Sequence, residues 1–493
     1  NTSRKFANLR SNKGSNLPLS ALTCLLLAAS GAYAYTEAGV SGNTSSWESA
    51  EYKKDWGLVS MNASTAYALG FNGSGIKIGV MDSGVLLSHP EFQDGRIHTV
   101  KTIGNYSKNG MRYPDAALGN GPIDKNQPVK DGKRNFNKND NGVFKKGEAF
   151  NGDGSWVRGV NDAHGTHVGG TMAASRDGSG MHGVAFGAQL YSANTGGNDN
   201  MTYGPNQDYN YFLKGYTALA DAGAKVINNS WGSNRRVNSS FAGALGYKPT
   251  YDWRAVPEYD VEFYDVTVAN QTTAAKDHIN LKDMNEAKKA YYQFVTSGEK
   301  SFLDAAYEVA VKRGVIQVFT AGNRSLMAES FTRAALPYFR PNAEDYWINV
   351  TGQTGADGYP NDSNEYIRGH KASSDIQEFN LAGHSKWWTI AAPSSGIYSA
   401  YVELTDNANY GKAIYKSSGG TSMAAPHVSG ALGVIMQRYP YMSIPQIRET
   451  MLTTARQRTL RAGHGAGGMP KEWIQMLLIR LFRLFIPFPA VSN

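Results

Sequence analysis

The chain has 493 residues, 18% of them charged, and carries a formal net charge of +8. Its length is sufficient for a large hydrophobic core and would by itself allow two or three domains, although large α/β folds often run longer as one. The positive charge lies at the two ends, since residues 1–34 carry +4 and residues 451–493 carry +5, which leaves −1 for residues 35–450. The body of the chain therefore has no basic excess to attract phosphates, and we expect no nucleic-acid partner.

The first 34 residues have the pattern of a secretory signal peptide. Four basic residues precede an apolar run at 17–29, and a small-x-small site ends at Ala34, so we expect cleavage after Ala34. The run is too short to cross a membrane as a helix. Cys24, the single cysteine, lies inside it, so the mature chain would have no disulfide and no thiolate chemistry. Residues 35–54 follow as a short polar leader.

The first candidate for chemistry is Asp82. It ends the apolar run 76–82 (IKIGVMD) and is followed by Ser83 and Gly84. Such a run is typical of a buried parallel strand, and ligands of open α/β sheets bind beyond the carboxyl ends of the strands. The structural alternative is that Asp82 is an ordinary turn or helix-capping residue.

Residues 104–161 interrupt the strand–helix alternation and are rich in Gly, Asn, Asp and Lys. A solvated surface loop is the favoured interpretation of this insertion. Calcium binding is the alternative, although the ligand spacing matches no complete motif.

Directly after this insertion, residues 162–171 (DAHGTHVGGT) place His164 and His167 among small residues. A lone histidine is more often a satisfied core or surface group than a catalytic one.

Two further apolar runs, 226–232 (VINNSWG) and 314–323 (GVIQVFTAGN), each end in small or polar residues. Both are predicted to be strands. The second delivers Asn323 at its end, where the alternative is again a simple turn residue. Between the two runs lies a second insertion, 233–297, whose segment 283–294 is compatible with a helix.

The most informative motif is at residues 420–427 (GTSMAAPH), directly before an apolar helical pattern. A serine at the N-terminus of a helix lies near free backbone N–H groups and the positive end of the helix dipole, which stabilise developing negative charge. Ser422 is therefore a candidate nucleophile. An ordinary N-cap serine or threonine is the structural alternative.

The three motifs, in the chain order Asp, His, Ser, resemble the subtilisin-like serine protease (subtilase) family from about residue 56 to about residue 454. The resemblance implies an α/β fold of three layers, with a mostly parallel central sheet flanked by helices. It further implies that Asp82 is the orienting carboxylate, His164 the general base, Ser422 the nucleophile, and Asn323 the oxyanion-hole donor. The joint pattern makes the structural alternatives for these residues much less favourable.

The same resemblance implies that Ser230, Trp231 and Gly232 pair with an extended substrate peptide through the backbone. Trp231 is larger than the residue often found there. We weigh two interpretations of its indole, the wall of a specificity pocket and a packed core aromatic. No cofactor is required, and structural calcium is compatible with the family, with no metal ligand identified in the sequence.

The signal peptide, the insertions and the absence of mature cysteines resemble the passenger domain of a Gram-negative autotransporter subtilase. This resemblance implies a secreted or cell-surface protein that acts on protein or peptide substrates. Such proteins normally continue into a C-terminal membrane barrel, so we expect membrane attachment only through a barrel that is missing from this chain. We expect the 493-residue chain itself to be a monomer.

The catalytic domain is predicted at 55–454, with a last helix at 444–454 and an atypical tail at 455–493. The tail is first basic and then apolar. A truncated or frame-altered tail outside the fold is the favoured interpretation, with a membrane-surface amphipathic helix as the alternative.

Two functions are weighed: an active serine endopeptidase, and an inactive surface antigen or adhesin on a subtilase scaffold. The complete set of four site residues favours the enzyme.

Overall fold

The structure is a computed structural model. It describes residues 39–108, 110–111, 143–158, 161–195, 208–231, 284–323, 330–353, 379–380, 382–406, 408–460 and 474–478. The predicted signal peptide, Gly232 and most of the second insertion lie outside these residues. No helix in the described part of the chain is long and apolar enough to cross a bilayer.

Seven parallel strands form the centre of the fold, in the order β11-β10-β9-β8-β1-β7-β2. Four of them, β8 to β11, are buried at every position, as expected for strands that are covered on both faces. The strands are β1 (Lys77–Asp82), β2 (Ile97–Thr99), β7 (Gln189–Asn194), β8 (Val226–Asn229), β9 (Ile316–Thr320), β10 (Trp347–Gln353) and β11 (Thr389–Pro393).

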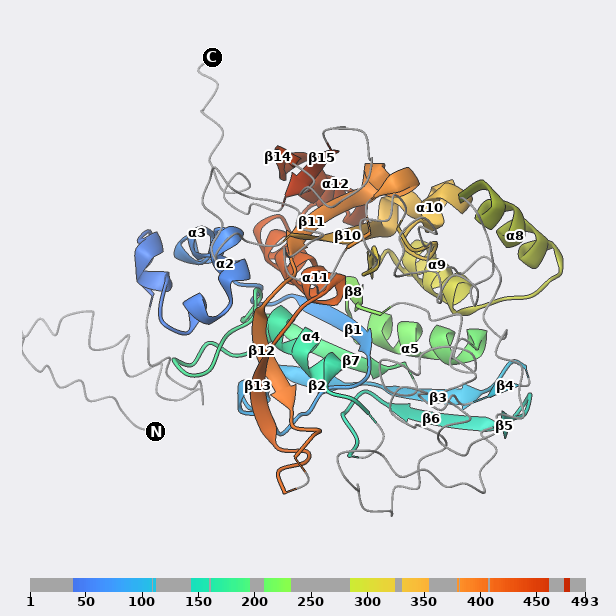
Figure 1. The fold of residues 1–493 in the computed structure, drawn as a ribbon, viewed down its shortest axis with the longest axis horizontal. Helices are drawn as coiled ribbons and strands as arrows, with labels where there is room; N and C mark the ends of the chain where they lie inside the picture. The colour runs from blue at the N-terminus through green and yellow to red at the C-terminus, as the bar shows by residue number, and fades with distance from the viewer. Residues whose placement is uncertain are drawn as a thin grey trace, which may run out of the picture.

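Helices cover both faces of this sheet (Figure 1). On one face lie α4 (His164–Ala173) and α11 (Thr421–Arg438), and on the other lie α5 (Tyr209–Asp221) and α9 (Phe302–Arg313). The alternation of side chains explains the two cores, since Val80 belongs to the α4/α11 core and its neighbour Met81 to the α5/α9 core. The predicted three-layer α/β fold is confirmed.

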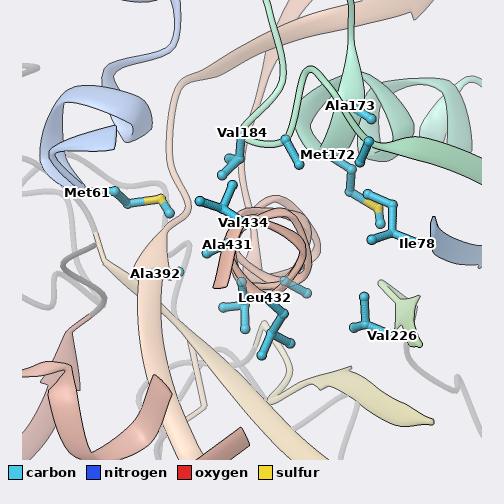
Figure 2. Packing of buried hydrophobic residues seen from close by; sticks show 14 of the residues in the cluster. Met61, Ile78, Met172, Ala173, Val184, Val226, Ala392, Ala431, Leu432 and Val434 are labelled. Atoms are coloured by element: carbon cyan, nitrogen blue, oxygen red, sulfur yellow. The ribbon is translucent and has the colours of Figure 1, made fainter. Parts of the chain in front are cut away.

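Helix α11 runs through the interior of the first core. Ala431 and Val434 lie on one side of it and Leu432 on another, and side chains of the sheet and of α4, together with Val184, surround the helix (Figure 2). All but three of its 18 residues are buried, so the helix is apolar on nearly all sides. Such a helix is held in place along most of its length, which suits an element that presents a reactive side chain.

The other helices of the described residues lie at the periphery (Figure 1). The predicted helices at 283–294 and 444–454 are present as α8 and α12. The peripheral helices are α2 (Trp56–Ser60), α3 (Ala63–Ala68), α8 (Met284–Thr296), α10 (Leu336–Phe339) and α12 (Ile444–Thr454), with 3₁₀ segments η1 (Thr44–Trp47), η2 (Tyr52–Lys54), η3 (Pro90–Phe92), η8 (Pro341–Tyr346) and η10 (Gly383–Trp388).

The described part of the leader is packed into the catalytic domain. Tyr52 is buried and belongs to the α4/α11 core, and its hydroxyl donates to the Leu58 carbonyl at 2.8 Å. Trp47 packs on the same core, with its ring 6.4 Å from that of Phe186. Residues 39–54 thus contribute to the domain that was predicted to begin at residue 55.

Among the described residues, three antiparallel pairs lie outside the central sheet. Two of them include the ends of the first insertion, so these ends form a ribbon where the sequence favoured a solvated loop. The pairs are β3 (Lys101–Asn105) with β6 (Ala149–Asp153), β4 (Gly110–Met111) with β5 (Val143–Phe144), and β12 (Ile397–Val402) with β13 (Ala413–Ser418).

The tail differs from its favoured interpretation. Residues Arg456–Leu460 form β14 and residues Ile474–Leu478 form β15. β15 pairs in parallel with β11, and β14 pairs antiparallel with β15, so both extend the central sheet at its edge. These two segments therefore belong to the fold, and 474–478 is a strand where the alternative interpretation expected a helix.

Candidate active site

Asp82 is the last residue of β1, and its side chain is 1% exposed. One carboxylate oxygen, Oδ1, accepts the Ser83 N–H at 2.7 Å and lies 2.9 Å from Nδ1 of His164. The other, Oδ2, is buried and has no hydrogen-bond partner among the described residues. A buried carboxylate that faces an imidazole orients the ring and stabilises its protonated form.

His164 is the first residue of α4, which brings it against the end of β1. Two glycines permit this approach. Gly84 has φ +92°, and a Cβ on Gly165 would lie 2.5 Å from the Gly84 carbonyl oxygen. The Gly165 N–H also donates to Ser83 Oγ at 2.8 Å, which fixes the start of the helix. The small residues around the histidine are therefore required by the close crossing of helix and strand.

The second histidine of the motif, His167, has a structural environment. It is fully buried, and its Nε2 lies 3.0 Å from the Ile397 carbonyl and 3.1 Å from the Lys416 carbonyl. Both partners are acceptors, so Nε2 carries the proton. Burial, reinforced by the nearby His164, lowers the pKa of His167 to about 4, and the ring stays neutral. His167 joins α4 to the β12–β13 hairpin.

Ser422 is the second residue of α11, as the motif predicts. Its hydroxyl donates to the Ser230 carbonyl oxygen at 2.7 Å, just after β8, and the Ser230 hydroxyl donates back to the Ser422 carbonyl oxygen at 2.8 Å. The predicted nucleophile thus lies at the carboxyl end of the strand next to β1. The carboxyl ends of β1 and β8 lie side by side, because Val80 of β1 pairs with Asn228 of β8.

Asn323 follows β9, the next strand along the sheet, and is exposed. Its Oδ1 accepts both the backbone N–H and the hydroxyl of Thr421, each at 2.8 Å. The acceptor end of the amide is thus occupied by Thr421, which leaves Nδ2 as the donor that the predicted oxyanion role requires. Thr421 is therefore a further residue of the site, where the sequence offered it only as a possible helix cap.

Trp231 is a core residue in the structure. The indole is 2% exposed, lies 5.4 Å from the ring of Phe302, and has the Arg333 guanidinium 4.7 Å above it. Its Nε1–H donates to the Met81 carbonyl at 2.7 Å. The interpretation as a pocket wall is therefore wrong for the indole, and the packed-core alternative describes it. The hydrogen bond ties the end of β8 to the strand that carries Asp82.

The four predicted catalytic side chains thus lie at the carboxyl end of β1, in the segment after β9, and at the N-termini of α4 and α11. The comparison with known families agrees with this arrangement, since the profile described as "Subtilase family" matches residues 73–467. The chain belongs to the subtilase family.

Individual relatives show how far the likeness extends. The chain is 31% identical over 437 residues to an extracellular serine protease of Serratia marcescens, covering 86% of this chain and 33% of that protein. It is 24% identical over 401 residues to the Neisserial autotransporter lipoprotein NalP of Neisseria meningitidis, covering 80% and 32%. It spans about a third of the length of these relatives. Among solved structures, fervidolysin from Fervidobacterium pennivorans is similar at a TM-score of 0.43 and 20% identity, over 89% of this chain and 48% of that one.

No group of three or more His, Cys, Asp or Glu side chains in the described ranges is arranged to hold a metal ion. The Asp- and Asn-rich part of the first insertion, at 139–142, lies outside these ranges. Structural calcium accordingly stays a prediction.

Proposed function

We propose that this subtilase is a serine endopeptidase in which Ser422 is the nucleophile. His164 takes the Ser422 proton as the hydroxyl attacks the scissile carbonyl, and it returns that proton to the leaving amine. The acyl-enzyme that remains is hydrolysed by water with His164 again as base. The observation that carries the proposal is the 2.9 Å contact between His164 Nδ1 and the buried Asp82, which fixes the tautomer that a general base requires.

The oxyanion of the tetrahedral intermediate is stabilised by Asn323 Nδ2 and by the backbone N–H of Ser422. The first turn of α11 adds the positive end of a helix dipole. Thr421 holds the amide of Asn323 before substrate arrives, so no reorganisation is needed during the reaction. Donors placed in advance favour the transition state over the ground state.

We further propose that extended peptide substrates pair with the backbone beyond β8, at Ser230 and Trp231. Main-chain pairing supplies affinity there and side-chain pockets set preference. Secretion or display on the cell surface is proposed by analogy with the extracellular protease of Serratia and with the autotransporter NalP, which carry those descriptions in their names. The passenger-domain role is proposed from the likeness to NalP. The monomeric state stays a prediction.

Covalent labelling tests the activity directly. The purified chain is incubated with a fluorophosphonate probe, beside Ser422→Ala and beside Ser297→Ala, which changes an exposed serine after α8. We expect labelling of the unchanged chain and of Ser297→Ala, and none of Ser422→Ala. Folded protein that shows no label dependent on Ser422 would defeat the proposal and favour an inactive surface antigen on this scaffold.

A further inference from the structure

Helix α11 contains a proline four residues after the proposed nucleophile. In an α-helix the N–H of residue i+4 donates to the carbonyl of residue i. Pro426 has no N–H, so the carbonyl of Ser422 loses its regular helical donor. Pro426 is buried, as is the first part of the helix around it, so water does not readily replace that donor.

Ser230 supplies a replacement from outside the helix. Its hydroxyl donates to the Ser422 carbonyl at 2.8 Å, while its own carbonyl accepts the Ser422 hydroxyl at 2.7 Å. Ser230 is itself fully buried. Two reciprocal hydrogen bonds therefore connect the end of β8 to the residue that carries the nucleophile.

The direction of the Ser230 hydroxyl is set by two more buried groups. Asn228 Nδ2 donates to Ser230 Oγ at 2.7 Å, and Ser429 Oγ donates to Asn228 Oδ1 at 2.9 Å. All three side chains are fully buried. Because Ser230 Oγ already accepts from Asn228, its proton is free to point at the Ser422 carbonyl. Ser429 is two helical turns beyond Ser422, so the chain of hydrogen bonds returns to the same helix.

We propose that Ser230 is a positioning residue for the nucleophile, with Asn228 and Ser429 as its supports. Its hydroxyl replaces the helical donor that Pro426 removes and so fixes the backbone of Ser422. That backbone determines where the Ser422 hydroxyl and N–H point. The inference rests on the proposed function of Ser422, and it adds a side-chain role for Ser230 to the backbone role already proposed.

A double-mutant cycle of Ser230→Ala and Pro426→Ala tests the proposal in the full chain. Ser230→Ala removes the donor and keeps the backbone that pairs with substrate. We expect kcat per active site, counted by burst titration, to fall about tenfold with KM changed less than about twofold. Pro426→Ala restores a helical N–H to the Ser422 carbonyl. In that background Ser230→Ala should lower kcat less than about twofold.

Ser429→Ala provides an independent variant far from the substrate. We expect it to lower kcat about two- to threefold by loosening Asn228, and to have no further effect once Ser230 is alanine. Equal losses of kcat on Ser230→Ala in the two backgrounds, or additive effects of Ser230→Ala and Ser429→Ala, would overturn the positioning role. Counting active sites removes any contribution of unfolded protein to these ratios.

The same cycle is measured by urea unfolding in the Ser422→Ala chain, which keeps the Ser422 carbonyl position and cannot digest itself. We expect the unfolding midpoint to drop on Ser230→Ala, and to drop clearly less when Pro426→Ala is present. Unfolding is measured without any catalytic activity. If the unchanged chain proved inactive, the proposed function would be defeated, but the unfolding cycle would still test the hydrogen bond between Ser230 and the Ser422 carbonyl. Absence of coupling in unfolding would defeat the inference alone.

Discussion

His427 of α11 and Asp55, the N-cap of α2, form a pair buried from solvent, with Nε2 of the histidine 2.9 Å from Oδ2 of the aspartate. The other ring nitrogen, Nδ1, lies 2.7 Å from the Met423 carbonyl, which can only accept, so Nδ1 carries a proton. A Cβ on Gly57 would lie 2.2 Å from Nε2, so glycine is required there. The pair links the N-terminal segment to the helix that presents Ser422.

Asp55→Ala should destabilise the fold strongly, because it leaves the His427 ring buried without its carboxylate partner. We expect the free energy of unfolding to fall by about 3–5 kcal/mol in the Ser422→Ala chain, measured in urea. Lys312→Ala is the matched control, since Lys312 also lies 2.9 Å from a carboxylate, on Glu308, but is 70% exposed. It should cost less than about 1 kcal/mol. Similar costs for both variants would contradict the role of burial.

Asn323→Asp distinguishes the role of the amide oxygen of Asn323 from that of its N–H donor. Aspartate retains an oxygen that can accept from Thr421, but it removes the N–H donor to the oxyanion. We expect kcat to fall by about 10²–10³ on a peptide ester or amide, with little change in urea stability. Asn323→Leu should lower kcat as much. A wild-type kcat in either variant would show that Asn323 is not the oxyanion donor.

The buried carboxyl of Glu91 makes the stability of the fold depend on pH. Burial raises its pKa to about 8, while Oε1 accepts from the Tyr415 hydroxyl at 2.7 Å and from the Met181 N–H at 3.1 Å. Burial likewise raises the pKa of Glu51 to about 7. The folded state therefore holds protons that the unfolded chain releases above about pH 4.5. The resulting stabilisation is complete below that pH and is lost as the pH rises through 7 to 8.

Glu91→Gln keeps an oxygen that can accept from Tyr415 and removes the titration. We expect the stability of the Ser422→Ala chain to fall between pH 5 and pH 9 in urea, and the fall to shrink by about a few kcal/mol in Glu91→Gln. The exposed Glu299→Gln should leave the profile unchanged. An identical slope with and without Glu91 would show that its carboxyl is ionised in the fold throughout this range.

Local sequence patterns were sufficient to predict where a strand ends and where a helix begins, and two of the site residues lie at such positions. Asp82 ends β1 because an apolar run stops there, and Ser422 begins α11 because the small-residue segment precedes a long apolar helix. The environment of Trp231 could not be predicted in this way, since its burial depends on Phe302 and Arg333, distant in sequence. The strand at 474–478 similarly depends on pairing with β11, so its local pattern gave a different expectation.

Trp231→Leu tests the corrected position of the indole. Because the ring is buried and its N–H is bonded to Met81, we expect a loss of about 2–4 kcal/mol in the free energy of unfolding. The cleavage preference on a peptide library should stay the same. Trp387→Leu, at a site that is 70% exposed, should change stability by less than about 0.5 kcal/mol. A changed preference at unchanged stability would place the indole at a substrate pocket after all.

Asp82→Asn should leave the fold intact and nearly abolish turnover. An asparagine of the same shape can present its N–H₂ to His164, which then holds its proton on Nε2 and cannot accept one from Ser422. We expect kcat to fall by about 10⁴ at neutral pH, with KM and urea stability little changed. Asp82→Ala should lower kcat similarly, because the imidazolium loses its stabilising charge. If Asp82→Asn kept more than about a tenth of the activity, the His164–Asp82 contact would not carry the mechanism.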